Sequence, residues 1–487
     1  MKTNPKKHQL EALEKLNLQE FAWLWDMGLG KTWMGCRKIE DLFSIFTKPK
    51  ILIVCPNAVT DVWQEEIIKH TNIDEYKVNV CRGTVKQRLQ FFDREIQIIN
   101  FEGLTTIQKE LKQVIWNLII VDESQRIKNH KALQTNIMMT LKSEQRMILS
   151  GTPFPNSYLD AFSQFLFLDR GRTFGQNFFG FRNTYFYDAF LEETLKMKQE
   201  AYDLFAKGDS KTASGIMRRI KFREEKKFPI WKIIPSKKED LMAKIATKSH
   251  RLEKKDVLDL PEKIYLKRYA YLSPDQKKCY KQIVDDCITF LNDTTCTAPV
   301  AITKILRLSQ ITSGFLKTEE GEITNFKDKP KLDAIKEDVE NILLENDTNK
   351  IIIWANFRHD VETLQETLKE YAPVIMYGGT TDKKEIIEKF QTDQTCRIFI
   401  GNPRSAGLGI TLTKANYALY YSCSNNPEDW MQSQDRNYRI GSEMHKNITY
   451  INYLVKGTID EIILQGLLGK EDMQDVLLKY VKNYKGD

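Results

Sequence analysis

The sequence predicts an α/β fold with two parallel-sheet lobes and a helical insertion or bridge between them. Two stretches of the chain, one before about residue 170 and one after 328, contain short β-branched apolar runs that alternate with helical patterns. Continuous apolar strands between helices are typical of a parallel sheet that is buried on both faces. The chain has 487 residues, which is too many for one ordinary hydrophobic core, so we expect two or three domains.

Each expected strand is a short apolar run. The runs of the first lobe are 51–55, 96–99, 118–121 and 147–149, and those of the second lobe are 351–354, 374–376, 397–400, 417–421 and 449–453. Between about Phe174 and Lys327 the sequence is rich in Phe, Tyr, Lys and Glu, and helical spacing replaces the strand pattern. We therefore expect a first lobe at 1–172, a helical protrusion and linker at 173–327, and a second lobe at 328–487.

Composition argues against several classes of protein. No apolar run approaches the length of a membrane-spanning helix, and the polar start of the chain does not resemble a secretory signal. The eight cysteines are scattered without a Cys-x-x-Cys pair, and the six histidines show no metal-ligand spacing. We therefore expect a cytoplasmic protein with reduced thiols and no membrane partner. The net charge of +7 is by itself weak support for a polyanionic partner.

A glycine-rich turn follows the first apolar segment, Phe21–Trp25, and leads into a helical pattern. Strand, glycine-rich turn and helix form the context in which backbone N–H groups and a helix N-terminus bind phosphates. Lys31 can neutralise the β- and γ-phosphates of a nucleotide, and Thr32 can ligate Mg²⁺. Trp25 occupies the place of the usual first glycine, so the alternative is an ordinary glycine-rich helix cap. The residues expected around the nucleotide are Asp26, Met27, Gly28, Leu29, Gly30, Lys31 and Thr32.

Two carboxylates end the buried strand expected at 118–121. Residues at the carboxyl edge of a parallel sheet face the ligand crevice. Asp122 can hold Mg²⁺ and Glu123 can orient and activate an attacking water. A solvated strand end is the alternative, but the phosphate loop lies about ninety residues upstream, a common spacing for the two motifs of a nucleotide-hydrolysing lobe.

Further motifs follow in order along the chain. Residues 121–129 read Val-Asp-Glu-Ser-Gln-Arg-Ile-Lys-Asn, residues 149–156 contain Gly-Thr-Pro, and residues 426–441 contain Gln-Ser-Gln-Asp-Arg-Asn-Tyr-Arg-Ile-Gly. With His8-Gln9 and the segments 51–56, 261–274 and 405–412, these motifs resemble those of Swi/Snf-type helicase-related ATPases. The resemblance covers nearly the whole chain, and the Gly-Thr-Pro and Arg-Ile-Gly forms differ from those of the RNA-unwinding DEAD-box branch.

The resemblance implies two RecA-like lobes that use ATP and Mg²⁺, and it implies a role for each matching residue. Gln9 would bind the adenine base, and Gln432 would contact ATP or position one of the arginines that contact the γ-phosphate. Arg436 and Arg439 would be arginine fingers that reach across the cleft to the γ-phosphate, and their spacing predicts that they share one helix face. The implied catalytic set is Lys31, Asp122, Glu123, Arg436 and Arg439.

The resemblance also implies a duplex DNA partner that is held through its phosphates without sequence specificity. The matching positions are Lys128, Asn129, Arg358 and Arg404. The favoured function is an ATP-dependent, monomeric translocase on double-stranded DNA. The alternatives are a strand-separating DNA or RNA helicase and an ATP-gated clamp with little turnover. Ser124 and Gln125 replace the family's Ala and His, which puts the coupling of ATP state to the other lobe in question.

Overall fold

The computed structural model describes residues 1–155, 157–226, 229–292, 298–318, 321–406, 410–424 and 426–469. Spatial proximity divides the chain into two compact units. One consists of Met1–Asp26 with Gly30–Leu252, and the other of Met27–Leu29 with Glu253–Asp487. The segment expected as a separate helical region therefore contributes to both units, and the division at 172 and 327 stays a prediction.

The first unit is built on a seven-stranded sheet whose neighbouring strands all run parallel. The strand order is β3 (Val78–Cys81), β4 (Ile96–Asn100), β2 (Ile51–Cys55), β5 (Ile115–Asp122), β6 (Lys142–Leu149), β1 (Glu20–Trp25) and β9 (Ser249–Leu252). The central strands are almost wholly buried, because their apolar side chains pack on both faces of the sheet. The four apolar runs predicted for this lobe are confirmed as strands.

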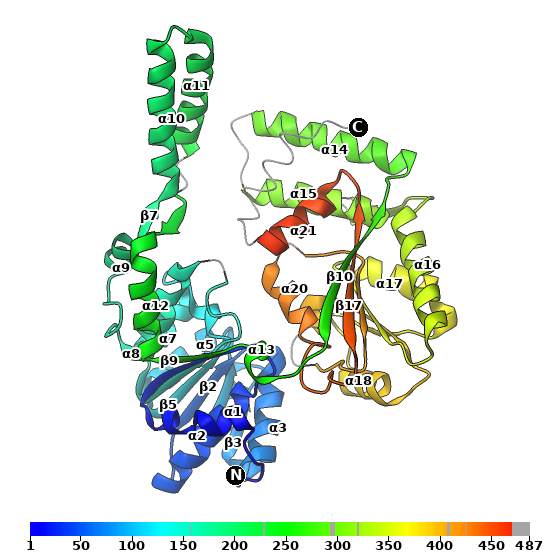
Figure 1. The fold of residues 1–487 in the computed structure, drawn as a ribbon. Helices are drawn as coiled ribbons and strands as arrows, with labels where there is room; N and C mark the ends of the chain where they lie inside the picture. The colour runs from blue at the N-terminus through cyan, green and yellow to red at the C-terminus, as the bar shows by residue number, and fades with distance from the viewer. Residues whose placement is uncertain are drawn as a thin grey trace. The chain divides into compact units, whose positions relative to one another are not determined.

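Helices of the first unit lie between these strands in the chain, and several of them pack against the sheet, whereas the two longest extend away from it (Figure 1). The helices of this unit are α1 (Lys7–Glu11), α2 (Lys31–Ile45), α3 (Thr60–His70), α4 (Val85–Leu89), α5 (Gly103–Thr106), α6 (Gln108–Gln113), α7 (Leu133–Thr140), α8 (Ala161–Asp169), α9 (Phe178–Tyr185), α10 (Ala189–Ala206), α11 (Ser210–Lys226) and α12 (Lys238–Thr247). Parallel strands need such crossover connections, since a short turn can join only antiparallel neighbours.

The long helices α10 and α11 lie side by side as a hairpin (Figure 1). An antiparallel strand pair, β7 (Phe186–Asp188) with β8 (Trp231–Ile233), forms its base. The aromatic side chains of Phe162, Phe181 and Tyr185 are buried and pack together beneath this base. These three side chains are therefore part of the hydrophobic core.

The second unit is built on a six-stranded sheet whose neighbouring strands also run parallel. Its order is β10 (Glu262–Ala270), β17 (Asn447–Val455), β16 (Tyr417–Tyr420), β13 (Ile351–Trp354), β15 (Ile398–Gly401) and β14 (Val374–Met376). The five predicted runs of this lobe are confirmed. The prediction of two parallel-sheet α/β lobes is thus confirmed as a fold class.

The helices of the second unit are α13 (Lys254–Val257), α14 (Pro274–Asn292), α15 (Ala298–Ser313), α16 (Pro330–Glu345), α17 (Arg358–Thr367), α18 (Lys383–Thr392), α19 (Pro403–Ala406), α20 (Pro427–Gln434) and α21 (Ile459–Gly469). A short antiparallel pair, β11 (Phe315–Lys317) with β12 (Ile323–Asn325), lies between α15 and α16 in the chain. None of the helices described is long and apolar enough to cross a membrane.

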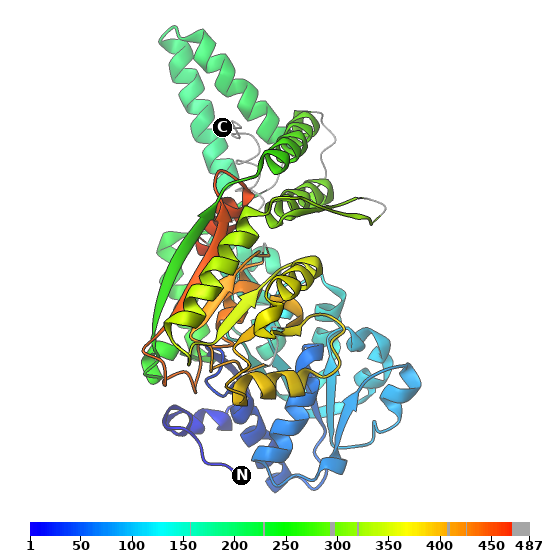
Figure 2. The ribbon, with the colours of Figure 1, turned by 90° about the vertical axis from the view of Figure 1, so that its right-hand side faces the viewer.

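Strand β10 was not predicted by its sequence pattern, which is a mixture of charged, aromatic and aliphatic residues. It nevertheless pairs with β17 along its full length, from Glu262 opposite Asn447 to Ala270 opposite Val455. Figure 2 shows the two strands side by side. The segment that joins the two predicted lobes is therefore an edge strand of the second sheet, and an edge strand tolerates polar residues because one side of it faces solvent.

Candidate active site

The glycine-rich turn connects strand β1 to helix α2. Gly28 and Gly30 have φ angles of 83° and 84°, in the left-handed region that favours glycine. Gly30 is further restricted because a Cβ atom there would collide with the Nε2 atom of Gln9. Helix α2 begins at the next residue, Lys31. The N-terminus of α2 therefore starts directly at the loop, as an anion site requires.

Gln9 is buried against this loop. Its Nε2 atom donates to the carbonyl of Gly30 over 3.1 Å, and its Oε1 atom accepts from the backbone N–H of Lys6 over 2.7 Å. Both the oxygen and the nitrogen of the carboxamide are thus hydrogen-bonded, and the side chain holds the residue that precedes α2. The contact of Gln9 with adenine, which the resemblance implies, stays a prediction.

The ammonium group of Lys31 lies at the carboxyl end of β1. It donates to the carbonyl of Trp25 over 2.8 Å and to that of Asp26 over 3.3 Å. The residue is buried, with 8% of its surface exposed. These carbonyls hold the positive charge beside the loop, where it can meet an anionic ligand.

Asp122 ends strand β5 and is held by two donors. The indole N–H of Trp63 donates to its Oδ2 atom over 2.9 Å, and the backbone N–H of Glu123 donates to its Oδ1 atom over 3.0 Å. Burial, together with the negative charge of Glu123, raises the pKa of Asp122 to about 6. A cation beside this carboxylate would favour its charged form, so the site suits a hard divalent ion such as Mg²⁺.

Trp63 reaches Asp122 because helices α2 and α3 pack closely. A Cβ atom added to Gly35 of α2 would lie 2.7 Å from the edge of the Trp63 ring. The sequence patterns did not identify Trp63 as a site residue, so its role in orienting the carboxylate was missed. A tryptophan within a helical pattern gives no sign in the sequence that its N–H group has a polar partner.

Glu123 has a φ angle of 54°, one of three positive values among the non-glycine residues described. A glutamate in this region carries backbone strain, which is often found at functional sites. Its Oε2 atom accepts from the Nε2 atom of Gln125 over 2.8 Å. The Oε1 atom of Gln125 in turn accepts from the hydroxyl of Ser150 over 2.8 Å. Glu123 is therefore linked to the Gly-Thr-Pro segment through Gln125.

Ser124, the other departure from the family pattern, makes a second hydrogen-bonded link to the Gly-Thr-Pro segment. Its hydroxyl donates to the Oε1 atom of Gln164 over 2.6 Å, and the Nε2 atom of Gln164 donates to the carbonyl of Pro153 over 2.5 Å. Ser124 and Gln125 are both buried. The two unusual residues thus connect the acidic pair to residues 150–153 within the first unit. Asn156, at the end of that motif, lies outside the described residues.

The predicted fingers follow helix α20 in the second unit. Arg436 is buried, and its Nε atom donates to the carbonyl of Gln432 over 2.9 Å. Guanidinium nitrogens of Arg436 and Arg439 approach the carbonyl of Ile410 at 3.4 and 3.5 Å. The expectation that both arginines share a helix face is wrong, because α20 ends at Gln434.

After the helix the chain is held by residues 412 and 415. The carbonyl of Arg436 accepts from the N–H of Leu412 over 2.8 Å, and the side chain of Asn437 donates to the carbonyl of Ala415 over 3.2 Å. We call residues 435–442 the finger loop. The nearby glycine-rich motif includes 407–409, which lie outside the described residues.

The predicted nucleic-acid residues fall into two pairs, one in each unit. Lys128 and Asn129 are adjacent, directly after the turn of 3₁₀ helix at Ser124–Ile127. Arg358 and Arg404 follow β13 and β15, which are paired neighbours, so both lie at the carboxyl edge of the second sheet. Both side chains are largely exposed, at 68% and 79%, and they pair with Glu362 and Asp429.

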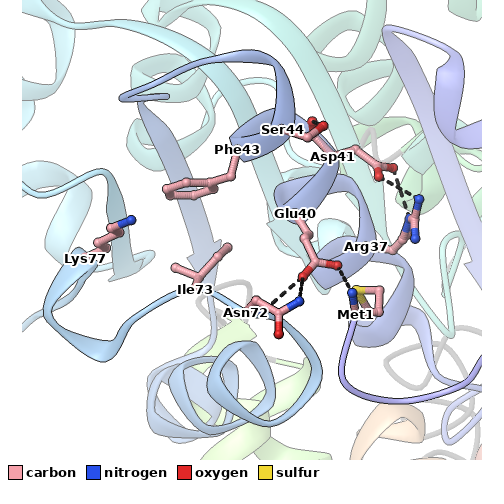
Figure 3. Close-up of a pocket in the computed structure, with 9 residues that line it drawn as sticks. All are labelled: Met1, Arg37, Glu40, Asp41, Phe43, Ser44, Asn72, Ile73 and Lys77. Carbon is pink, nitrogen blue, oxygen red and sulfur yellow. Dashed lines mark hydrogen bonds and ion pairs between the residues drawn. The ribbon is translucent and has the colours of Figure 1, made fainter.

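A shallow hollow of about 510 Å³ lies away from the phosphate loop, at the C-terminal half of α2 (Figure 3). Its polar groups are engaged with one another. Glu40 accepts from Asn72 and pairs with the amino group of Met1, and Arg37 pairs with Asp41 over 2.9 Å. Nothing in this arrangement connects the hollow to the candidate active site.

The two family models that match the chain include most of the strands of both sheets. The SNF2-related domain matches residues 24–316, and the helicase conserved C-terminal domain matches residues 334–441. The chain belongs to the SNF2-related family. The SNF2-related match begins just before the phosphate loop, and the helicase C-terminal match ends within the finger loop.

Several relatives are similar over most of this chain. The putative ATP-dependent helicase/translocase YwqA of Bacillus subtilis is 26% identical over 93% of this chain and 46% of its own length. An uncharacterized ATP-dependent helicase of Mycoplasma genitalium is 25% identical over 92% and 39%, and the mouse DNA excision repair protein ERCC-6 is 23% identical over 88% and 28%. The chain therefore spans less than half the length of these relatives.

A solved structure titled Sulfolobus solfataricus SWI2/SNF2 ATPase core in complex with dsDNA is also similar. It is 24% identical, covers 99% of this chain and 94% of its own, and has a TM-score of 0.43. The SNF2-related assignment rests on the two family models and not on this likeness.

Proposed function

We propose that this chain is an ATP-dependent motor that hydrolyses ATP to ADP and phosphate and translocates along double-stranded DNA inside the cell. The observation that carries the proposal is the arrangement at the carboxyl edge of the first sheet. The phosphate loop, the Lys31 ammonium, the strained Glu123 and the indole-bound Asp122 all lie at the ends of β1 and β5. A nucleotide-hydrolysing lobe needs this combination of groups.

Each residue has a specific task in the proposed reaction. The N–H groups of the loop and the Lys31 ammonium hold the β- and γ-phosphates. Thr32 and Asp122 hold Mg²⁺, which neutralises phosphate charge when it is bound. Glu123 orients the attacking water and accepts its proton, and the amide of Gln125 fixes the carboxylate that does so.

The remaining groups have two roles. Some stabilise charge on the reacting phosphoryl group, and the others bind DNA. Arg436 and Arg439 act as arginine fingers, which stabilise the charge that spreads over the equatorial oxygens. Gln432 holds Arg436 through its backbone carbonyl. The DNA contacts are Lys128, Asn129, Arg358 and Arg404, and the motor acts as a monomer without sequence preference.

The deciding experiment is to measure ATP hydrolysis with duplex DNA, single-stranded DNA, RNA and no nucleic acid. We expect duplex DNA to give the largest stimulation. Stimulation by single-stranded DNA or RNA alone would favour a strand-separating helicase. Nucleic-acid binding with no multiple turnover under any condition would favour an ATP-gated clamp and would contradict the motor.

Replacement of Trp63 by phenylalanine should weaken Mg²⁺ binding while keeping the aromatic packing. The variant loses the N–H donor that orients Asp122, and loss of such an outer partner typically weakens metal affinity by about 10- to 100-fold. The measurement is ATP turnover as Mg²⁺ is titrated. Trp116→Phe is the matched control, because its buried indole donates to the carbonyl of Leu111 instead. Equal Mg²⁺ requirements in both variants would contradict the role of Trp63.

Salt should weaken DNA binding steeply, because lysine and arginine contacts to phosphates release counterions. Arg404→Gln is expected to lower affinity for all sequences alike and to reduce the salt slope by about 1. The measurement is duplex affinity over a range of salt concentrations. Lys336→Gln is the control, since Lys336 lies on α16 and pairs with Glu340. An unchanged slope for Arg404→Gln would remove this residue from the proposed DNA surface.

A further inference from the structure

The larger segment of the second unit begins at Glu253, and we call its first part, residues 253–270, the linker. The start of this linker is bonded to the finger loop. Lys254 is the first residue of α13, and only Glu253 separates it from Leu252, the last residue of β9. Its ammonium group pairs with the carboxylate of Asp435 and donates to the carbonyl of Tyr438 over 2.6 Å. Both partners belong to the finger loop, and Tyr438 directly precedes Arg439.

This ion pair is largely buried. The side chains of Lys254 and Asp435 are 7% and 21% exposed. Breaking a buried pair leaves a charge without compensation, so the linker and the finger loop resist separation. Lys254 also lies 5.2 Å from the centre of the Tyr438 ring, which adds a cation–π contact.

The next part of the linker reinforces the same connection. On β10, the hydroxyl of Tyr265 donates to the Oε1 atom of Gln434 over 2.8 Å, and the ammonium of Lys263 donates to it over 3.1 Å. Lys263 also lies 4.0 Å from the centre of the Tyr438 ring. Gln434 ends α20, so the linker contacts both the end of this helix and the loop after it.

The contacts surround the backbone that carries the predicted fingers. Asp435 directly precedes Arg436, and Tyr438 directly precedes Arg439. A shift of the Lys254 ammonium therefore acts on the peptide units on the N-terminal side of both arginines. Lys254 is two residues beyond Leu252, so their Cα atoms can lie at most about 7 Å apart. Lys254 therefore stays close to the end of β9.

We infer that Lys254 is a positioning residue for ATP hydrolysis: it fixes the finger loop, and so the guanidinium group of Arg439, to the linker that follows β9. The inference rests on the proposed function, because it assumes that this arginine acts on ATP. In this role Lys254 does not touch the nucleotide. Its effect on turnover passes entirely through the finger loop.

The test is a double-mutant cycle of Lys254→Met with Arg439→Ala in the full chain, with turnover measured at saturating ATP and duplex DNA. Methionine keeps most of the side-chain stem and removes the charge. We expect Lys254→Met to lower kcat by about 10- to 100-fold, the scale of a misplaced catalytic group, with the KM for ATP and the DNA affinity unchanged. In the Arg439→Ala background the same change should cause little further loss.

Three further variants separate positioning from a general loss of structure. Lys255→Met is the matched control, because Lys255 is the exposed neighbour that pairs with Glu253, and it should turn over normally. Lys254→Arg should recover much of the rate, since it restores the charge. Asp435→Asn breaks the same ion pair by removing the carboxylate. If Lys254→Met does not fold, a cycle of Asp435→Asn with Arg439→Ala gives the same test.

The outcomes distinguish this inference from the proposed function. If Arg439→Ala turns over at the wild-type rate, the finger role is wrong. If Arg439→Ala is slow but Lys254→Met has a normal kcat, or if the two losses multiply fully, Lys254 does not act through the finger loop and the inference is overturned. A Lys254→Met defect that lies only in the KM for ATP would likewise overturn it.

Discussion

Replacing Glu123 by glutamine is expected to leave ATP binding intact and to slow hydrolysis by about 10³-fold, within the range attributed to general acid–base catalysis. The amide has nearly the shape of the carboxylate, but it cannot accept the proton of the attacking water. Its oxygen can still accept the hydrogen bond that Gln125 donates to Glu123. The local structure should therefore survive. The measurements are nucleotide affinity and single-turnover hydrolysis in the presence of duplex DNA.

The matched control for this change is Glu102→Gln, also in the first unit. Glu102 is exposed and pairs with Arg126 over 3.4 Å. Its substitution should leave turnover unchanged. Wild-type hydrolysis by Glu123→Gln would show that the base lies elsewhere, and failure of that variant to bind ATP would show that Glu123 is structural.

The second large effect is expected for Arg439→Ala, which should bind ATP normally and lose about 10³-fold or more in turnover, as expected for an arginine finger. Arg439 is a better choice than Arg436, because Arg436 is buried and holds Gln432 as well as Ile410. Truncating Arg439 therefore disturbs the loop less. The experiment is to titrate duplex DNA against wild type and variant while turnover and binding are measured separately.

Arg268→Ala is the control for this experiment. Arg268 lies on β10 and pairs with Glu337 over 2.7 Å, so its loss removes an arginine of the second unit without touching the finger loop. We expect normal turnover for this control. DNA can stimulate hydrolysis only by its differential affinity for the active conformation. If Arg439→Ala is still stimulated to the wild-type rate, the finger mechanism does not apply to this residue.

Several site features were predictable because they depend on short, local patterns. The phosphate loop requires glycine where φ is positive, and Gly28 and Gly30 occupy those positions directly before the helix that begins at Lys31. The acidic pair was predictable because a continuous apolar run ends at Asp122. In both cases the residues that determine the feature lie within a few positions of one another.

The links between motifs were not predictable in the same way. Gln125 was identified only as a departure from the family pattern, yet its two amide ends join Glu123 to Ser150. The pair formed by Lys254 and Asp435 joins residues 181 positions apart. A single sequence contains no signal for such pairs, because the polar atoms find each other only after the sheets have formed.

The sequence by itself determined the two parallel-sheet lobes, the phosphate loop and the acidic pair, since continuous apolar strands and glycine positions express local backbone and burial preferences. Only the tertiary structure decided that the linker becomes edge strand β10, that α20 ends before Arg436, and that Lys254 is buried against the finger loop. The physical reason is competition between distant partners. Strand β10 forms because β17 offers it a complete ladder, and the loop after α20 is held where the N–H of Leu412 donates to the carbonyl of Arg436.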